Sequence, residues 1–113
     1  ITIADSTGWT GIEDLNGVIP SNFELSQNYP NPFNPSTTIR YAVPVESKVS
    51  ISIFNLLGQE ITTLVSGVES AGYHEVQFNG MNLSSGVYLY RINAISTAGS
   101  KEFSSTKKLI LLK

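Results

Sequence analysis

Apolar and polar residues alternate with a two-residue period along most of the chain after Phe23. Residues 37–43 place threonine, isoleucine, tyrosine and valine on one side, and residues 49–53 alternate valine and isoleucine with serine. Because successive side chains of a strand point to opposite faces, this pattern predicts strands with one buried face. The same alternation predicts further strands over residues 60–68, 73–78, 87–95 and 102–112.

We count about seven strands from Phe23 onward, separated by turn-forming residues about every 8–12 positions. No segment carries a 3.6-residue apolar stripe of helical length. The sequence therefore predicts an all-β fold, an immunoglobulin-like antiparallel β-sandwich of about seven strands. The term describes architecture alone, because the chain has no cysteine and so lacks the cysteine–tryptophan–cysteine pattern of antibody domains.

Two of these strands are predicted to be central. Residues 87–92 carry large side chains on both faces, and residues 109–112 are apolar on both faces, so each requires cover on two sides. Three lysines flank the last run and oppose aggregation of so apolar a segment. The asparagine–glycine pair at residues 79–80 predicts a hairpin-type turn.

The first 22 residues show no sustained period, because glycines and Pro20 interrupt every short run. We therefore divide the chain into a linker or leader from a preceding domain, residues 1–22, and one domain, residues 23–113. The chain begins at Ile1, without methionine or a signal segment, which we interpret as a piece of a longer polypeptide.

Composition removes several classes of protein. The chain has 113 residues, a formal net charge of −2, 14% charged residues and no cysteine. One domain is expected at this length, and the low charge argues against intrinsic disorder. The basic residues are scattered, so no nucleic-acid partner is expected, and no apolar run approaches the ~18 residues of a transmembrane segment.

The sequence shows no residue pattern typical of a catalytic or metal-binding site. His74 is the only histidine, and a serine–histidine–aspartate triad would require Asp5 or Asp14 from the leader. The glutamates lie singly beside turns, and no loop has the ligand spacing of a calcium site. We predict that the domain is not an enzyme and holds no cofactor or metal.

Residues 28–35 place three prolines within a short segment of aromatic and asparagine residues. Each proline fixes its own φ and restricts the residue before it, so the segment is stiff before it packs. The asparagine amides can satisfy backbone groups that proline cannot, and the two aromatic rings can anchor the segment. We call it the proline strap, and predict a structural role for Asn28, Tyr29, Pro30, Asn31, Pro32, Phe33, Asn34 and Pro35.

Five motifs follow one another in a fixed order. They are the proline-containing segment 25–39, the strand and asparagine-x-leucine-glycine-glutamine element of 49–59, the alanine-glycine-x-histidine turn of 71–74, the serine-glycine-valine-tyrosine strand of 83–91 and the threonine-lysine-lysine-apolar run of 106–113. Together they resemble the type A C-terminal sorting domains of type IX (Por-type) secretion cargo. Phe78 and Asn79 depart from the family pattern but keep a bulky ring followed by a turn-forming residue.

The resemblance implies a function in protein export. Domains of this family direct a larger cargo protein from the periplasm through an outer-membrane translocon to the cell surface or medium. A surface sortase often removes them and anchors the cargo. The partners implied are thus the translocon, the sortase and the preceding cargo domain, with processing in the segment before Phe23. The residues expected to carry translocon recognition are Gly86, Val87, Tyr88, Lys107, Lys108, Leu109, Ile110, Leu111, Leu112 and Lys113.

Two alternatives remain open from the sequence. A carbohydrate-binding or adhesion module of a secreted hydrolase would display coplanar aromatic rings, for which Tyr73, Tyr88, Tyr90 and Phe103 are candidates. Core packing is the better interpretation of Tyr88 and Tyr90, because their strand is predicted to be central. A homodimer formed by edge pairing of residues 102–112 would be compatible with sorting.

Overall fold

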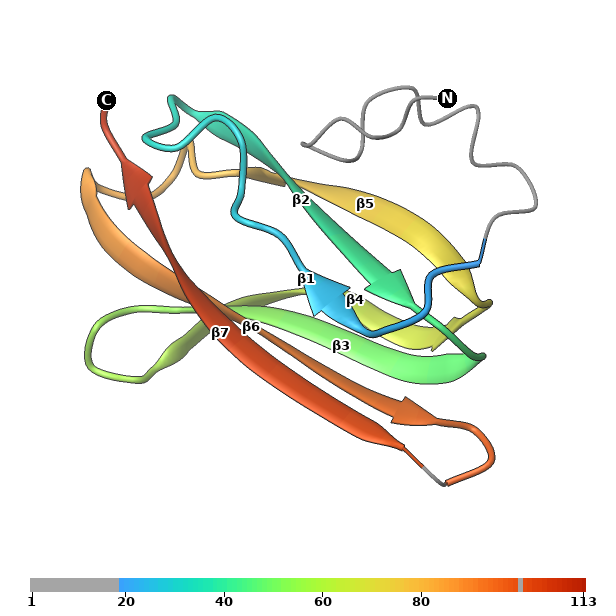
Figure 1. Ribbon diagram of the computed structural model, residues 1–113. Coiled ribbons are helices and arrows are strands. Elements are labelled where there is room, and N and C mark those ends of the chain that lie inside the picture. Colours follow the sequence, from blue (N-terminus) through green and yellow to red (C-terminus); the bar gives the residue numbers. More distant parts are fainter. Residues whose placement is uncertain (1–18, 100) are drawn as a thin grey trace, which may run out of the picture.

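Seven antiparallel strands form two sheets in the computed structural model, which describes residues 19–99 and 101–113 (Figure 1). One sheet has the order β1-β2-β5, and the other has the order β4-β3-β6-β7. The described residues contain no helix, so none of them forms a helix long and apolar enough to span a membrane. The strands are β1 (Glu24–Leu25), β2 (Ser36–Val43), β3 (Ser47–Phe54), β4 (Glu60–Glu69), β5 (Gly72–Asn79), β6 (Gly86–Ser96) and β7 (Glu102–Leu111).

This architecture confirms the predicted all-β antiparallel sandwich of about seven strands. Most of the predicted linker, residues 1–18, lies outside the described residues, as do Asp5 and Asp14. The division between a linker and a domain near residue 22 therefore stays a prediction.

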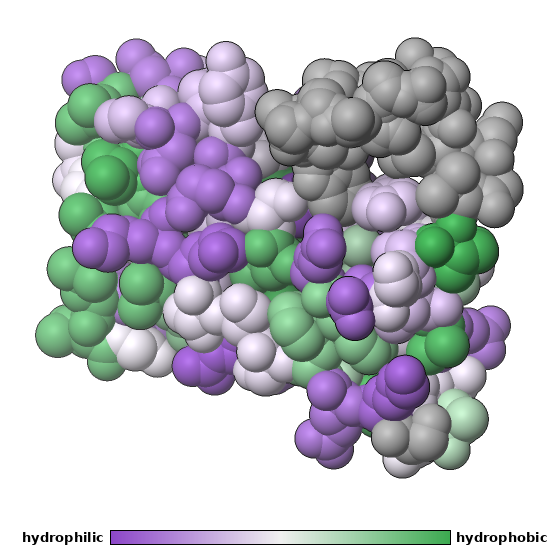
Figure 2. All heavy atoms as spheres, viewed as in Figure 1, coloured by the Kyte–Doolittle hydropathy of each residue, from purple (hydrophilic) through white to green (hydrophobic). Residues whose placement is uncertain are grey.

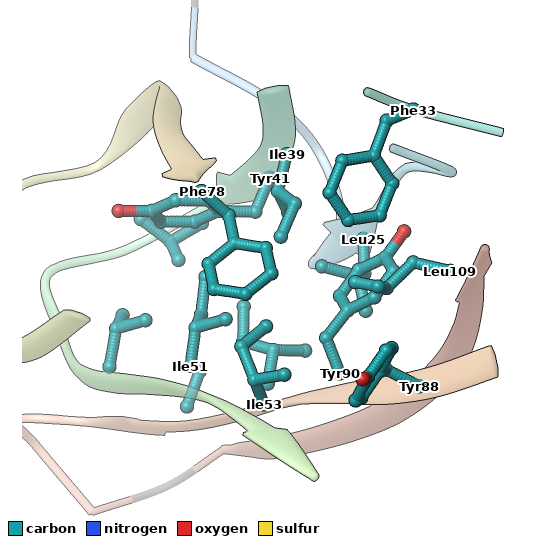
Figure 3. Packing of buried hydrophobic residues seen from close by; sticks show 14 of the residues in the cluster. Leu25, Phe33, Ile39, Tyr41, Ile51, Ile53, Phe78, Tyr88, Tyr90 and Leu109 are labelled. Carbon is teal, nitrogen blue, oxygen red and sulfur yellow. The ribbon is translucent and has the colours of Figure 1, made fainter. Parts of the chain in front are cut away.

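The core lies between the two sheets and follows the predicted alternation. β2, β3 and β6 each bury every second side chain, and the intervening residues are half-buried or exposed, except at the end of β2. Figure 3 shows side chains of both sheets and of the proline strap converging on this interior. Its largest fully buried side chains are Tyr90, Phe33, Ile39, Ile51, Ile53, Ile92, Leu109 and Leu111.

The predicted position of the last strand is partly wrong. β6 is central, as predicted, between β3 and β7, but β7 is the edge strand of its sheet. Leu109 and Leu111 are fully buried, whereas Ile110 is half-buried and Leu112 is 53% exposed. Only one face of β7 packs on the core, because the strands of residues 19–99 and 101–113 form no second layer outside this sheet.

The predicted hairpin turn at residues 79–80 is also wrong, since β5 and β6 belong to different sheets. The segment instead crosses between the sheets, and the Gly80 N–H donates to the Pro35 carbonyl at 2.7 Å. A Cβ atom at Gly80 would lie 3.1 Å from Leu111 Cδ2 and 3.4 Å from the Phe33 ring. Glycine is favoured here by close packing rather than by turn conformation, because an added Cβ would press on the Leu111 side chain.

A rigid turn joins β3 to β4. The Asn55 side-chain oxygen accepts hydrogen bonds from the backbone N–H groups of Leu57 (2.9 Å) and Gln59 (3.0 Å). Gly58 supplies the positive φ, +87°, that closes the turn. The turn holds Leu57 85% exposed, so an apolar side chain is fixed in solvent at one end of the sandwich.

Candidate functional site: the C-terminal strand and the proline strap

The C-terminal half of β7 divides into two faces. Leu109 and Leu111 point into the core, where they pair in register with Tyr88 and Gly86 of β6. Lys108 is exposed, and Ile110 is half-buried on the opposite face. The apolar run is therefore both a structural part of the sandwich and a part of its surface.

The proline strap runs along the outer edge of β7. The Phe33 N–H donates to the Ile110 carbonyl at 2.9 Å, and the Leu112 N–H donates to the Phe33 carbonyl at 3.0 Å. These bonds form a parallel bridge between Phe33 and Leu111. An edge strand normally leaves such groups open to other chains, so here the strap closes the edge.

Two side chains before and within the strap extend this edge cover. The Asn31 side-chain oxygen accepts from the Ile110 N–H at 2.9 Å, and the Gln27 side-chain amide donates to the Lys108 carbonyl at 2.7 Å. These amides satisfy backbone groups of β7 that have no strand neighbour on that side. The strap thus covers residues 108–112, while the preceding residues of β7 pair only with β6.

Phe33 anchors the strap in the core. Its side chain is 1% exposed, and its ring centroid lies 6.0 Å from that of Phe78 in a tilted arrangement. Figure 3 shows the ring pointing from the strap toward the core, above Leu109. Phe33 therefore holds the strap in two ways, by its ring in the core and by its backbone hydrogen bonds to β7.

Asn28 and Thr37 fix the beginning of the strap through a buried network. The Asn28 amide donates to the Thr37 hydroxyl oxygen at 3.0 Å and to the Pro30 carbonyl at 3.2 Å. The Thr37 hydroxyl donates to the same carbonyl at 2.8 Å. Amide and hydroxyl groups thus replace the hydrogen bonds that the proline-rich backbone cannot form.

Lys113 is held beside the β5–β6 connection. Its backbone N–H donates to the Ser85 hydroxyl at 3.0 Å, and its ammonium donates to the Met81 carbonyl at 2.6 Å. Residues 108–113 therefore lie in a defined place rather than extending freely into solvent.

The family model described as "Secretion system C-terminal sorting domain" matches residues 27–111. This chain belongs to that family. The match begins just before the proline strap and ends with β7, so it includes both parts of the site. Membership confirms the resemblance seen in the sequence. It identifies a C-terminal sorting signal for type IX secretion, which implies a cargo polypeptide and export toward the cell surface or extracellular space.

The sorting domain also resembles a solved structure in its fold. CopC from Methylosinus trichosporium OB3b superposes with a TM-score of 0.54 over 80% of this chain and 93% of that one. The two sequences are 14% identical, so the likeness concerns the β-sandwich alone. A comparison with curated proteins finds no match.

The sorting domain exposes only some of the residues predicted for recognition. Tyr88, Leu109 and Leu111 are buried in the core, where no folded partner can touch their side chains. The remaining predicted residues are half-buried or exposed: Gly86, Val87, Lys107, Lys108, Ile110, Leu112 and Lys113. The translocon role of these residues stays a prediction, and the structure shows only which of their side chains pack in the core and which reach the surface.

The four aromatic candidates for carbohydrate binding do not form one platform in the sorting domain. Tyr88 and Tyr90 are buried, and the Tyr90 hydroxyl donates to the Ser26 carbonyl at 2.6 Å. Phe103 stacks on Phe23 with 5.5 Å between ring centroids, and Tyr73 lies in the other sheet. The predicted core position of Tyr88 and Tyr90 is confirmed.

The His74 ring contacts one aromatic ring and two oxygen atoms of neighbouring residues. Its ring lies 5.4 Å from that of Tyr41, its Nδ1 lies 3.2 Å from a Glu69 carboxylate oxygen, and its Nε2 lies 2.8 Å from the Ser70 carbonyl. Within residues 19–99 and 101–113 no group of three or more histidine, aspartate or glutamate side chains is placed to hold a metal.

Two buried tyrosines make the sorting domain sensitive to alkali. Burial raises the pKa of Tyr90 above its ordinary value near 10, and burial, followed by the Glu69 carboxylate, raises the pKa of Tyr41. Above about pH 10 the unfolded chain ionises these hydroxyls while the folded chain keeps both protons. The unfolded state then binds fewer protons, so stability falls as pH rises.

We expect the free energy of unfolding to fall above about pH 10 by up to about 2.7 kcal/mol per pH unit for the two groups. Below about pH 9 these groups should contribute no slope. Urea denaturation across this range measures the effect, and Tyr90→Phe serves as the comparison because it removes one of the two ionisations. An identical alkaline slope in this variant would contradict the assignment of Tyr90.

Proposed function

We propose that the sorting domain displays its export signal as a folded surface, made by the C-terminal half of β7 and the start of β6. Val87, Lys108, Ile110 and Leu112 form the outward part of this surface. Gly86, Lys107 and Lys113 adjoin it at the other face and at the end of the sheet. The observation that supports it is the strap: Phe33, Asn31 and Gln27 hold residues 108–112 in place against the sandwich. The buried residues Tyr88, Leu109 and Leu111 position the signal, and the domain acts as a ligand rather than a catalyst.

The partners of this signal follow from its family. We infer that an outer-membrane translocon receives the domain in the periplasm and passes the preceding cargo domain to the surface or medium. A surface sortase then removes the domain and anchors the cargo. Residues 1–22 serve as the linker to that cargo and contain the processing point. The carbohydrate-binding alternative loses support, because two of its four aromatic rings lie in the core.

Fusion of residues 23–113 to an inert folded reporter tests the proposal in a cell with type IX secretion. We expect the reporter at the cell surface or in the medium, measured by protease accessibility and by fractionation. Reporter without the domain should remain in the periplasm and serves as the control. Periplasmic retention of the fusion, with the sorting domain folded, would contradict the proposed function.

Deletion of residues 109–113 is a poor test of recognition. Leu109 and Leu111 are fully buried, so the deletion removes part of the core together with the signal. Substitutions confined to the outward face of β6 and β7 separate the two roles.

A further inference from the structure

The outer face of the four-stranded sheet changes character along its length. Strand register aligns its outward residues in rows across β3, β6 and β7. Toward the end occupied by the β6–β7 connection, two rows are polar or charged: Ser50–Asn93–Ser104 and Ser52–Arg91–Thr106. A solvated outer face of this kind is the usual arrangement for an antiparallel sheet.

Toward the other end the outward residues are apolar. Phe54 pairs with Leu89, Val87 pairs with Ile110, and Leu112 follows on β7. We call these five residues the outer apolar patch. The first four are half-buried and Leu112 is 53% exposed, while their chain neighbours Ile53, Tyr88, Tyr90, Leu109 and Leu111 are buried in the core.

The same end of the sandwich carries the exposed leucines of the β3–β4 turn. Figure 2 shows apolar residues gathered where Figure 1 draws this turn, the β5–β6 connection and the C-terminus. Leu57 is 85% exposed at the turn, one residue beyond Leu56 at 65%. Contiguous apolar surface on a sheet face marks an interaction site more often than scattered exposed residues do.

Two cations lie beside the outer apolar patch, although the whole chain has a net charge of −2. Lys108 pairs with Leu89, and the Arg91 guanidinium lies 5.2 Å from the centre of the Phe54 ring. Lys113 follows Leu112, and its ammonium donates to the Met81 carbonyl in the β5–β6 connection. Glu60 is the acidic residue in register with Phe54, and its carboxylate accepts a hydrogen bond from Thr63. The local charge therefore favours an acidic partner and disfavours a second copy of the same surface.

We infer that the outer apolar patch is the contact surface for a protein of the export machinery, one that presents apolar side chains surrounded by carboxylates. This inference rests on the proposed function and deepens it. It retains the outward members of the predicted signal, Val87, Lys108, Ile110 and Leu112, which adjoin Lys113. It adds Phe54, Leu89 and Arg91, which the sequence motifs did not single out.

Export of the reporter fusion tests this surface with matched variants. The patch variant carries Val87→Thr, Leu89→Thr and Ile110→Thr, which place a β-branched residue at each strand position while removing apolar contact area. The control variant carries Ser52→Thr, Asn93→Thr and Ser104→Thr on the polar rows of the same sheet. We expect the patch variant to deliver about tenfold less reporter, because apolar contacts at the centre of an interface dominate binding. The control variant should match the unmodified fusion.

A charge-reversal variant, Lys108→Glu with Lys113→Glu, supplies a second test that leaves the apolar residues in place. It should also reduce export about tenfold, since like charges across an interface oppose docking. Both variants are purified and melted, and each should unfold within about 4 °C of the unmodified domain. Normal export by either variant would overturn the inference, because each removes one half of the stated partner chemistry.

Other results would assign the outer apolar patch to a different partner or would contradict the proposed function itself. Retention of the unmodified fusion would overturn the proposed function and the inference with it. Sedimentation showing a dimer that the patch variant abolishes would assign the surface to self-association. Binding to vesicles of phosphatidylethanolamine and phosphatidylglycerol, lost in the patch variant, would assign it to a membrane. Either result would overturn the inference that a protein of the export machinery binds this patch.

Discussion

Replacing Phe33 with alanine is expected to lower the free energy of unfolding of the sorting domain by about 3–5 kcal/mol. The ring is 1% exposed, packs beside Phe78 and approaches Gly80, so its removal leaves a cavity that the proline-rich backbone cannot close. The backbone of the same residue holds the edge of β7 through Ile110 and Leu112. Loss of the anchor should therefore loosen the edge cover as well as the core.

Urea denaturation measures the loss of stability, and amide hydrogen exchange measures the edge. We expect the Leu112 N–H, which donates to the Phe33 carbonyl, to exchange faster in Phe33→Ala. Tyr29→Ala is the matched control, because this strap residue is aromatic but 80% exposed, and it should change stability by less than about 1 kcal/mol. Equal effects of the two variants would show that the strap is not anchored by Phe33.

Leu111→Ala is expected to cost about 2–5 kcal/mol, the range for removal of a fully buried leucine. Leu112→Ala, at the next position and 53% exposed, should cost less than about 1 kcal/mol. The pair tests which face of the last strand packs on the core, since a register shift by one residue would exchange the two results. Chemical denaturation of both variants measures the two losses in the free energy of unfolding.

Local alternation was sufficient to predict most strand faces. In β3, valine and isoleucine are buried while Ser50 and Ser52 lie on the opposite face, as the two-residue period requires. Tyr88 and Tyr90 are also buried as predicted, because large residues on both faces indicated a central strand. These predictions depend only on neighbours along the chain.

Sheet order could not be obtained in the same way, because it depends on contacts between distant segments. The run at residues 109–112 was predicted to be covered on both faces, but β7 is an edge strand, and no strand in the described part of the chain forms a second layer over its outer face. Asn79 and Gly80 have the composition of a hairpin turn, yet they cross between sheets where Gly80 packs against Phe33. The turn chemistry was ambiguous without knowledge of the partner strands.

The sequence singled out the two segments that meet at the candidate site, but not which of their residues lie on its surface. The strap and the last strand were both singled out, whereas their contact through Asn31 and Gln27 had no local signal. The outer apolar patch did leave a signal: Val87 and Leu89 are apolar at positions where alternation places solvent. That signal is ambiguous, because a central strand explains large residues on both faces equally well.

The parallel bridge between Phe33 and Leu111 also determines how the domain responds to tension. If the last strand is held and the chain is pulled from before the strap, the two bonded segments are drawn lengthwise past each other. The bonds at Ile110 and Leu112 then carry load simultaneously instead of opening one after another. The strap and β7 are therefore loaded in shear rather than peeled apart.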